Sequence, residues 1–348
     1  MMATPLLYIL PSGELSGTER MAIRTLQHLA DSFDGVIVAP PGPVHAHASQ
    51  CGLRSESFRS SAGLARLLWR AARREPELAV ASLDLSQAFL VVLAQALGRA
   101  RVRHLHIVRG GSDERLSYGY KRLLQPFPVA FVAVSDFVRE RLVAHGVDAA
   151  RISVVENFIE PSAVAWRPVF REAGVRRVLM LSRLDRIKRA GLLLQAVRSH
   201  PALGAMQFDL YGSGEQEAEL RAAAAGLPNV TLHGFRADAA GQLRSSDLLV
   251  HTCAEEPFGL VVLEAFAAGV PVLVPNAGGA GGLVRHGETG FHYAANDPDA
   301  LADALQALQS APAALLNAVV ANARAELSDR FHPARLAQRY RDLLQPRG

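Results

Sequence analysis

Residues 248–275 read LLVHTCAEEPFGLVVLEAFAAGVPVLVP, and this stretch indicates the class of fold. The apolar run Leu248 to His251 predicts a buried strand, and the run Val272 to Pro275 predicts a second one. Between them, the residues from Leu260 onward have the length of a helix, and Gly269 stands where a helix commonly ends. A strand, a helix and a strand in this order favour two parallel strands joined by a crossover.

The same alternation of apolar runs and helical patterns continues along the whole chain, so we predict an α/β protein with two Rossmann-like halves. The predicted strands are residues 6–10, 35–39, 78–82, 102–108 and 129–134 in the first half, and 177–181, 207–211, 230–233, 248–251, 272–275 and 290–292 in the second.

The chain has 348 residues and 37.4 kDa, which suits two domains. With 49% hydrophobic and 20% charged residues it is expected to be globular. The longest apolar run, Ala88 to Leu97, is too short to cross a bilayer and predicts a buried helix. The first apolar stretch ends at Pro11 without a basic region before it, so we predict no secretory signal and a cytoplasmic location.

Pro161 and Pro168 bracket a stretch without helical or strand period, which indicates the linker between the domains. We therefore expect an N-terminal domain over residues 1–163 and a C-terminal domain over 164–330. Residues 331–348 contain an amphipathic helix that is expected to pack back on the N-terminal domain.

Two cysteines, Cys51 and Cys253, are interpreted as buried thiols, without histidine or cysteine neighbours at metal-ligand spacing. The pair Asp297 and Asp299 flanks Pro298 and predicts a helix N-cap rather than a metal site. No metal site and no cofactor are expected.

The formal net charge is +4, but the positive charge is concentrated in residues 54–74 and 99–122, each of which carries a net +5. Nucleic-acid recognition motifs do not accompany these segments, so a nucleic-acid partner is not expected. From Leu64 to Arg74, arginines recur at helical spacing beside apolar residues. This stripe either rests on an anionic membrane surface or is simply a solvated helix face.

Lysine is rare, since only Lys121 and Lys188 occur among 37 cationic residues. A lysine ammonium contacts a phosphate as a point charge, whereas arginine presents a planar fork. Lys188 is therefore a candidate functional residue.

The segment Glu255 to Val272, EEPFGLVVLEAFAAGVPV, predicts an anion-binding site. The first helical turn has unpaired N–H groups from about Phe258 to Leu260, and Gly259 leaves room for a ligand. The string resembles the Glu-x7-Glu signature of retaining glycosyltransferases of family 4, and the resemblance extends over nearly the whole chain.

This resemblance implies the GT-B fold, with two Rossmann-like domains whose parallel sheets face each other across a cleft. It implies that Glu256 contacts the donor sugar, that Glu264 holds the nucleotide ribose, and that the helix N-terminus takes the diphosphate. Acids near a helix start are also favoured by the helix dipole, and Glu264 is open to interpretation as an ordinary surface residue.

Arg183 and Lys188 match the family's pair of cations that grip the diphosphate, although Arg189 stands where glycine is frequent. Gly212 and Phe235 lie in loops that border the nucleotide in the family, but glycine-rich turns after parallel strands are common anyway. In the segment NAGGAGG, Gly282 replaces the usual acid.

In the first half, Ser16 and Gly17 partly match the family's glycine-rich first loop. The family commonly carries a histidine that reaches the donor sugar, and His106 or Arg109 could occupy that place. His104 and His106 are equally well explained as core histidines. Two further residues fit the pattern, Ser135 and Asn157.

The implied function is retaining, metal-independent transfer of a sugar from a UDP- or GDP-sugar to a hydroxyl acceptor. The acceptor is expected to be a saccharide or lipid-linked saccharide of bacterial lipopolysaccharide or exopolysaccharide. The catalytic candidates are Glu256, Arg183, Lys188 and His106. A nucleotide-sugar 2-epimerase of the same fold, or a non-catalytic nucleotide-sugar-binding subunit, is the alternative.

Overall fold

The computed structural model describes residues 3–98, 100–111, 114–160, 169–172, 174–236 and 238–345. The chain forms two compact units: unit 1, Met1–Phe158 with Pro333–Gly348, and unit 2, Ile159–His332. The expected boundary between residues 163 and 164 lies in 161–168, outside the described residues.

Unit 1 contains a parallel sheet in the order β3-β2-β1-β4-β5-β6-β7. Five of these strands were predicted from buried apolar runs. The other two were missed because β3 is a polar and largely exposed edge and β7 has three residues. The strands are β1 (Thr4–Ile9), β2 (Phe33–Ala39), β3 (Arg54–Ser57), β4 (Glu77–Ser82), β5 (Arg101–Val108), β6 (Val129–Ala133) and β7 (Ile152–Val154).

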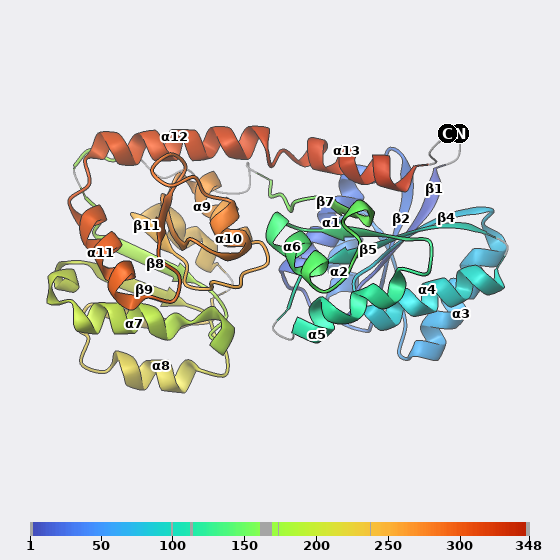
Figure 1. The fold of residues 1–348 in the computed structure, drawn as a ribbon, viewed down its shortest axis with the longest axis horizontal. Helices are drawn as coiled ribbons and strands as arrows, with labels where there is room; N and C mark the ends of the chain where they lie inside the picture. Colours follow the sequence, from blue (N-terminus) through green and yellow to red (C-terminus); the bar gives the residue numbers. More distant parts are fainter. Residues whose placement is uncertain are drawn as a thin grey trace. The chain divides into compact units, whose positions relative to one another are not determined.

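Helices cover both faces of this sheet (Figure 1). Helix α13 packs on α1, and the Arg341 guanidinium donates to the carbonyl of His28 at 2.6 Å. The helical elements of unit 1 are α1 (Gly17–Leu29), α2 (Val44–Gln50), α3 (Ser61–Arg74), α4 (Leu85–Leu97), α5 (Glu114–Ser117), η1 (Gly119–Leu124), α6 (Asp136–Ala144), η2 (Ala149–Arg151) and α13 (Pro333–Leu344).

Helix α4 is only half buried, which corrects the expectation of a buried helix. Ala88 and Val91 face the core, whereas Leu93 is 51% and Leu97 66% exposed. No single described helix is long and apolar enough to cross a bilayer. One pair of the described helices, Pro298–Gln309 with Ala313–Leu344, has the length and composition of a span when the two are taken together, but it is bent by 110°.

Unit 2 contains a second parallel sheet, in the order β10-β9-β8-β11-β12-β13. Each of its strands was predicted to within one residue at either end. Its elements are β8 (Arg177–Leu181), η4 (Arg186–Lys188), α7 (Ala190–Ser199), η5 (Pro201–Ala205), β9 (Gln207–Tyr211), α8 (Glu217–Ala224), β10 (Val230–Gly234), η6 (Ala239–Ser245), β11 (Leu248–Val250), α9 (Leu260–Ala268), β12 (Val272–Pro275), α10 (Gly278–Gly282), β13 (Phe291–Tyr293), α11 (Pro298–Gln309) and α12 (Ala313–Asp329).

The predicted N-cap at Asp297 is confirmed, because its Oδ1 accepts from the backbone N–H groups of Asp299 and Ala300 at 3.0 Å. The strand order of unit 2 reverses between β8 and β11, which are hydrogen-bonded neighbours. In open parallel sheets, ligands bind beyond the carboxyl ends of the strands at such a reversal. The reversal therefore indicates a ligand site at the loops after β8 and β11.

Candidate functional site

Three polar side chains from these two loops meet at the reversal point of unit 2. The Lys188 Nζ lies 2.5 Å from Glu256 Oε2, and the His251 Nε2 lies 3.3 Å from the same oxygen. Their side chains are 17%, 13% and 4% exposed for Lys188, Glu256 and His251, respectively. The carboxylate thus has one lysine and one histidine partner in a mostly water-excluded place.

The backbone of the β8 loop is fastened to the β11 loop beside this cluster. The Thr252 hydroxyl donates to the carbonyl of Lys188 at 2.6 Å. Arg189 follows in the left-handed region, with φ 53°, and its guanidinium pairs with Glu255 at 3.2 Å. Glycine adopts such a backbone conformation readily. Arg189, which stands where the family often has glycine, keeps this conformation and adds the ion pair with Glu255.

Electrostatics keep Glu256 ionised. Burial by itself would raise the pKa of the carboxyl, but hydrogen bonding and charge from His251, followed by Lys188, lower this pKa to about 2. Glu256 is therefore suited to accept hydrogen bonds or to stabilise positive charge, and not to donate a proton.

The N-terminus of α9 lies next in the chain after Glu256. Its N-cap is Gly259, with φ 100°, and no side chain caps the helix. The first N–H groups of a helix have no partner within it, so the turn that begins at Leu260 can receive an anion. Phe258 is buried and packs edge-on against Phe331, with ring centroids 6.3 Å apart.

The glycine-rich helix α10 holds the loop that carries Glu256. The Gly279 N–H donates to the Glu256 carbonyl at 2.6 Å. A Cβ on Gly279 would lie 2.1 Å from the Pro257 carbonyl oxygen, and one on Gly278 would lie 2.6 Å from that of Ala254. Glycine is required here because two backbones touch, a role that the sequence pattern did not reveal.

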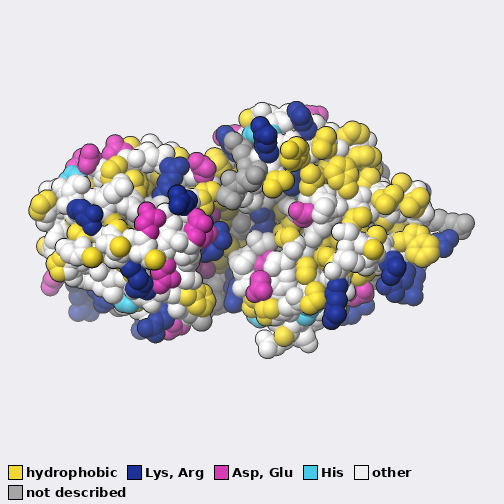
Figure 2. All heavy atoms as spheres, turned by 90° about the horizontal axis from the view of Figure 1, so that it is seen from below, with side chains coloured by type: hydrophobic (Ala, Val, Ile, Leu, Met, Phe, Trp, Pro, Cys, Tyr) yellow, Lys and Arg dark blue, Asp and Glu magenta, His cyan; other side chains and the backbone are white. Residues whose placement is uncertain are grey.

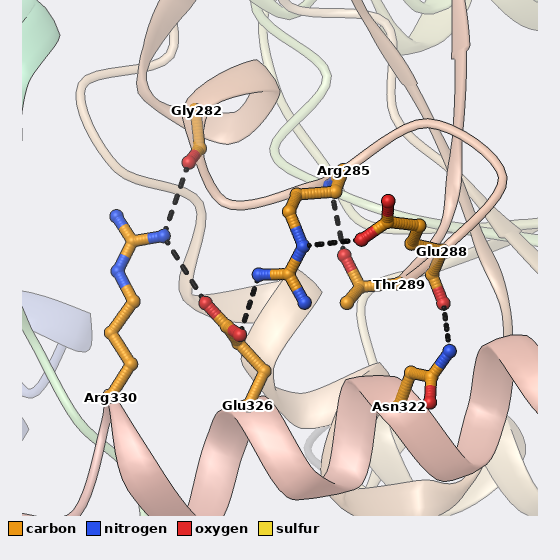
Figure 3. Close-up of polar contacts among 7 residues, drawn as sticks. All are labelled: Gly282, Arg285, Glu288, Thr289, Asn322, Glu326 and Arg330. Atoms are coloured by element: carbon orange, nitrogen blue, oxygen red, sulfur yellow. Dashed lines mark hydrogen bonds and ion pairs between the residues drawn. The ribbon is translucent and has the colours of Figure 1, made fainter.

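Ion pairs fasten the segment after α10 to α12 (Figure 3). Arg285 pairs with Glu288 at 2.9 Å and with Glu326 at 2.6 Å. Glu326 also pairs with Arg330, whose guanidinium donates to the carbonyl of Gly282 at 3.5 Å. The support of the Glu256 loop therefore extends to the long helix α12.

The other predicted site residues of unit 2 lie in the loops and the helix around the cluster of Lys188, His251 and Glu256, but not all of them contact it. Arg183 is 74% exposed and pairs with Asp185 at 2.8 Å. A Cβ on Gly212 would lie 1.8 Å from the Ser182 carbonyl oxygen, so this glycine packs against the loop of Arg183. Phe235 is 74% exposed just after β10, and Glu264 is half-buried on α9.

In unit 1, His106 lies in the core and is 0% exposed. Its Nδ1 lies 3.0 Å from the Ser82 hydroxyl, which also lies 2.7 Å from His104 Nε2. Burial lowers the pKa of His104 to about 3 and that of His106 well below its usual value, so both rings are neutral. This enclosure favours the interpretation of His106 as a core histidine, and its catalytic role stays a prediction.

Arg109, the other candidate, follows the carboxyl end of β5. Its guanidinium donates to the Asn157 side-chain oxygen at 3.0 Å and to the Tyr8 hydroxyl at 3.3 Å. Gly17 is the first residue of α1, behind the capping residue Ser16. Ser135 caps α6 in the same way, accepting from the Val138 N–H at 3.2 Å.

Two family models match the chain in succession. The model described as Glycosyltransferase Family 4 matches residues 15–163, and the one described as Glycosyl transferases group 1 matches residues 175–311. The chain belongs to the family 4 glycosyltransferases. The second match contains the β8 and β11 loops and the α9 helix of the cluster described above.

This family 4 chain is 30% identical over 253 residues to D-inositol 3-phosphate glycosyltransferase of Paenarthrobacter aurescens. The aligned region covers 66% of this chain and 61% of that protein. The chain thus spans about three fifths of this curated relative. Among solved structures, HepE of Anabaena in complex with UDP and glucose has a TM-score of 0.82 at 22% identity, covering 98% of this chain and 99% of that one. A lipopolysaccharide outer core galactosyltransferase has a TM-score of 0.74 at 14% identity over 98% and 99%. These structures establish the GT-B fold.

One group in the described part of this family 4 chain could hold a metal ion. The ligand atoms of His251, Cys253 and Glu256 lie within 4.8 Å of one another. This corrects the expectation that Cys253 has no histidine near it. Burial, followed by the charge of Glu256, raises the pKa of the Cys253 thiol to about 11, and the ammonium of Lys188 contacts the carboxylate. A cation would have to displace both a proton and Lys188.

Proposed function

We propose that this chain is a retaining, metal-independent glycosyltransferase that moves a sugar from a UDP- or GDP-sugar to a hydroxyl acceptor. The observation that carries the proposal is the ionised Glu256 held by Lys188 and His251, one turn before the uncapped N-terminus of α9. Such an arrangement offers cations and helix N–H groups to a diphosphate and a fixed carboxylate to a sugar.

In this proposal, residues 164–330 form the donor domain. Lys188 and the exposed guanidinium of Arg183 neutralise the charge that grows on the departing diphosphate, where electrostatic stabilisation lowers the barrier most. Glu256 contacts the donor sugar and Glu264 holds the ribose. The remaining contacts with the nucleotide come from residues that border it, namely Gly212, Phe235, Phe258, Gly259 and Leu260.

In this proposal residues 1–163 form the acceptor-side domain, and helix α13 packs on its helix α1. Gly17, the first residue of α1, belongs to the loop proposed to border the reacting sugar and the acceptor. Of the two candidates in this half, Arg109, held by Tyr8 and Asn157, is the one proposed to face the donor sugar, because His106 is enclosed. Its fixed positive charge suits a phosphate or a sugar hydroxyl.

The acceptor is proposed to be a saccharide or lipid-linked saccharide used for lipopolysaccharide or exopolysaccharide. The enzyme would work in the cytoplasm, peripherally on the inner face of the membrane. The exposed arginines of α3, among them Arg66 and Arg70, support this location because anionic lipid attracts basic side chains.

Thermal stabilisation by UDP, GDP and ADP, each with and without EDTA, tests donor binding. We expect one nucleotide to raise the melting temperature with EDTA present, because a ligand that binds only the folded state stabilises it by mass action. Lys188→Ala should abolish the shift. Arg186→Ala is the matched control, since Arg186 lies in the same loop but is 81% exposed. No shift with any nucleotide would contradict the proposed donor site.

The reaction itself is tested by incubation with the matching nucleotide sugars and saccharide acceptors, with the anomeric configuration of the product read by NMR. An inverted product would overturn the retaining mechanism. An epimerised nucleotide sugar formed without acceptor would favour the 2-epimerase. Nucleotide binding with unchanged cellular glycans in Glu256→Gln, but altered glycans on deletion, would favour the non-catalytic subunit.

A further inference from the structure

Helix α4 of unit 1 has an apolar side that no described residue covers. The helix, LSQAFLVVLAQAL, contains no charged residue, yet Leu93 is 51% and Leu97 66% exposed. A helix that is apolar all round is normally buried on all sides, whereas a surface helix carries charges on its outer face. The exposed apolar side of α4 is therefore expected to be buried against a partner or a membrane.

The apolar surface continues onto the neighbouring elements. Between α3 and α4 lies a groove of about 220 Å3. Trp69 of α3, which is 41% exposed, lines it together with Leu93 and Leu97. On the other side of α4, which contacts η1, Tyr120 is 42% and Leu123 48% exposed. Figure 2, seen from below, shows hydrophobic side chains gathered on unit 1 with Lys and Arg side chains near their edges.

The charged residues of the three helices that form this surface are all positive. Helices α3, α4 and η1 contain no acidic residue. The guanidinium of Arg73 lies over the Trp69 ring, 4.7 Å from its centroid. Within the part of the chain that the structure describes, α3 carries four exposed arginines that form no ion pair, namely Arg66, Arg70, Arg73 and Arg74.

We propose that this surface, formed by Trp69, Leu93, Leu97, Tyr120 and Leu123, inserts into the interface of an anionic lipid bilayer while the arginines of α3 contact the lipid headgroups. Aromatic and aliphatic side chains rimmed by arginine match the layered chemistry of a membrane interface. A second copy of the chain fits less well. In a two-fold dimer the same surface faces itself, which would bring two arginine rims together.

The proposal goes beyond adsorption of a basic helix, because it assigns the contact to α4 and η1 as well as to α3. It rests on the proposed function in one respect, namely that a lipid-linked acceptor is met at this surface. Nucleotide binding belongs to unit 2 and can be measured separately on every variant.

Trp69 is a natural reporter of insertion. The chain contains a second tryptophan, Trp166, so Trp166→Phe leaves Trp69 as the only one. Vesicles of phosphatidylcholine mixed with phosphatidylglycerol should shift the Trp69 emission to shorter wavelength, and brominated lipids should quench it. Binding without a shift or quenching would overturn insertion.

Vesicle flotation measures the apolar and the electrostatic contributions to membrane binding separately. Leu93→Gln with Leu97→Gln should weaken binding at least about tenfold at any ionic strength. Each of Arg66→Gln and Arg70→Gln should weaken it about fivefold, but only at low ionic strength. The matched controls are Leu315→Gln on α12, where the leucine is 39% exposed, and the exposed Arg244→Gln on η6. These should bind like the wild type.

The outcomes are distinguishable. Because Leu93 and Leu97 are exposed, the double variant should keep its melting temperature and its response to nucleotide. If the wild type fails to bind anionic vesicles at low ionic strength, the proposal is wrong even if nucleotide binding is intact. A dimer in solution that Leu93→Gln dissociates would also overturn it and identify a second copy as the cover.

Discussion

The Lys188 ammonium contacts the Glu256 carboxylate at 2.5 Å although 68 residues separate them in the chain. The contact arises because β8 and β11 are neighbours in the sheet and both loops leave from the carboxyl ends of their strands. The pair brings a cation for a phosphate and an anion for a sugar to one place, with His251 as the third member.

Glu256→Gln should lower kcat for sugar transfer at least about a hundredfold, a typical loss when a preorganised electrostatic partner is removed. The thermal shift with nucleotide should persist, because the amide keeps the shape of the side chain. Glu255→Gln is the control: Glu255 is adjacent but 59% exposed and should retain near wild-type kcat. Comparable losses in both variants would contradict the assigned role.

Lys188→Met and Glu256→Gln should not be additive in stability. Removing either partner leaves the other in a mostly buried place, so each single variant should lose about 1–3 kcal/mol of unfolding free energy. The double variant should lose clearly less than the sum. Urea unfolding of the four proteins in the cycle measures the coupling, and strict additivity would speak against an ion pair in solution.

His251→Leu should introduce an acid limb into the pH profile of kcat. The contact with His251 is a leading reason why the pKa of Glu256 is lowered to about 2, so its loss should move this pKa towards the ordinary range of a glutamate. Activity should then fall with decreasing pH at a higher pH than in the wild type and recover near pH 8. An unshifted acid limb would show that His251 has only a structural role.

Gly279→Ala should destabilise unit 2 and weaken the nucleotide-induced thermal shift, because a Cβ there would lie 2.1 Å from the Pro257 carbonyl oxygen. Gly282→Ala, in the same helix, meets nothing within 4 Å. It should be neutral or stabilising by up to about 1 kcal/mol. Equal melting temperatures for the two variants would contradict the close approach.

Stability should decline as the pH falls below about 6.5. The folded state holds His104 neutral down to a pKa of about 3, while the unfolded chain takes up a proton near the ordinary value of 6.5. The unfolded state therefore binds more protons in this range, and the free energy of unfolding should fall by up to about 1.4 kcal/mol per pH unit for this histidine. Urea unfolding at several pH values measures the slope. His104→Gln should flatten it, whereas the exposed His286→Gln should not.

Periodicity and motifs in the sequence determined the class of fold, the six strands of unit 2 and the helix that begins at Leu260. These features are local: the length of an apolar run, a glycine after a helix and a cap before it depend on residues close together in the chain. Lys188 and Glu256 were found in the same way, each within its own short motif. Their contact, and the part that His251 plays in it, could not be read from either motif.

Tertiary structure decided what depends on neighbours distant in sequence. The order of the strands placed the β8 loop beside the β11 loop and enclosed His106 while leaving Arg109 at a strand end. Packing turned Gly279 into a support for the Glu256 carbonyl and left Leu93 and Leu97 uncovered on a helix whose composition predicts burial. In each case the physical reason is the same: burial and contact are set by which surfaces meet across the fold, and sequence patterns report only which surfaces a segment has to offer.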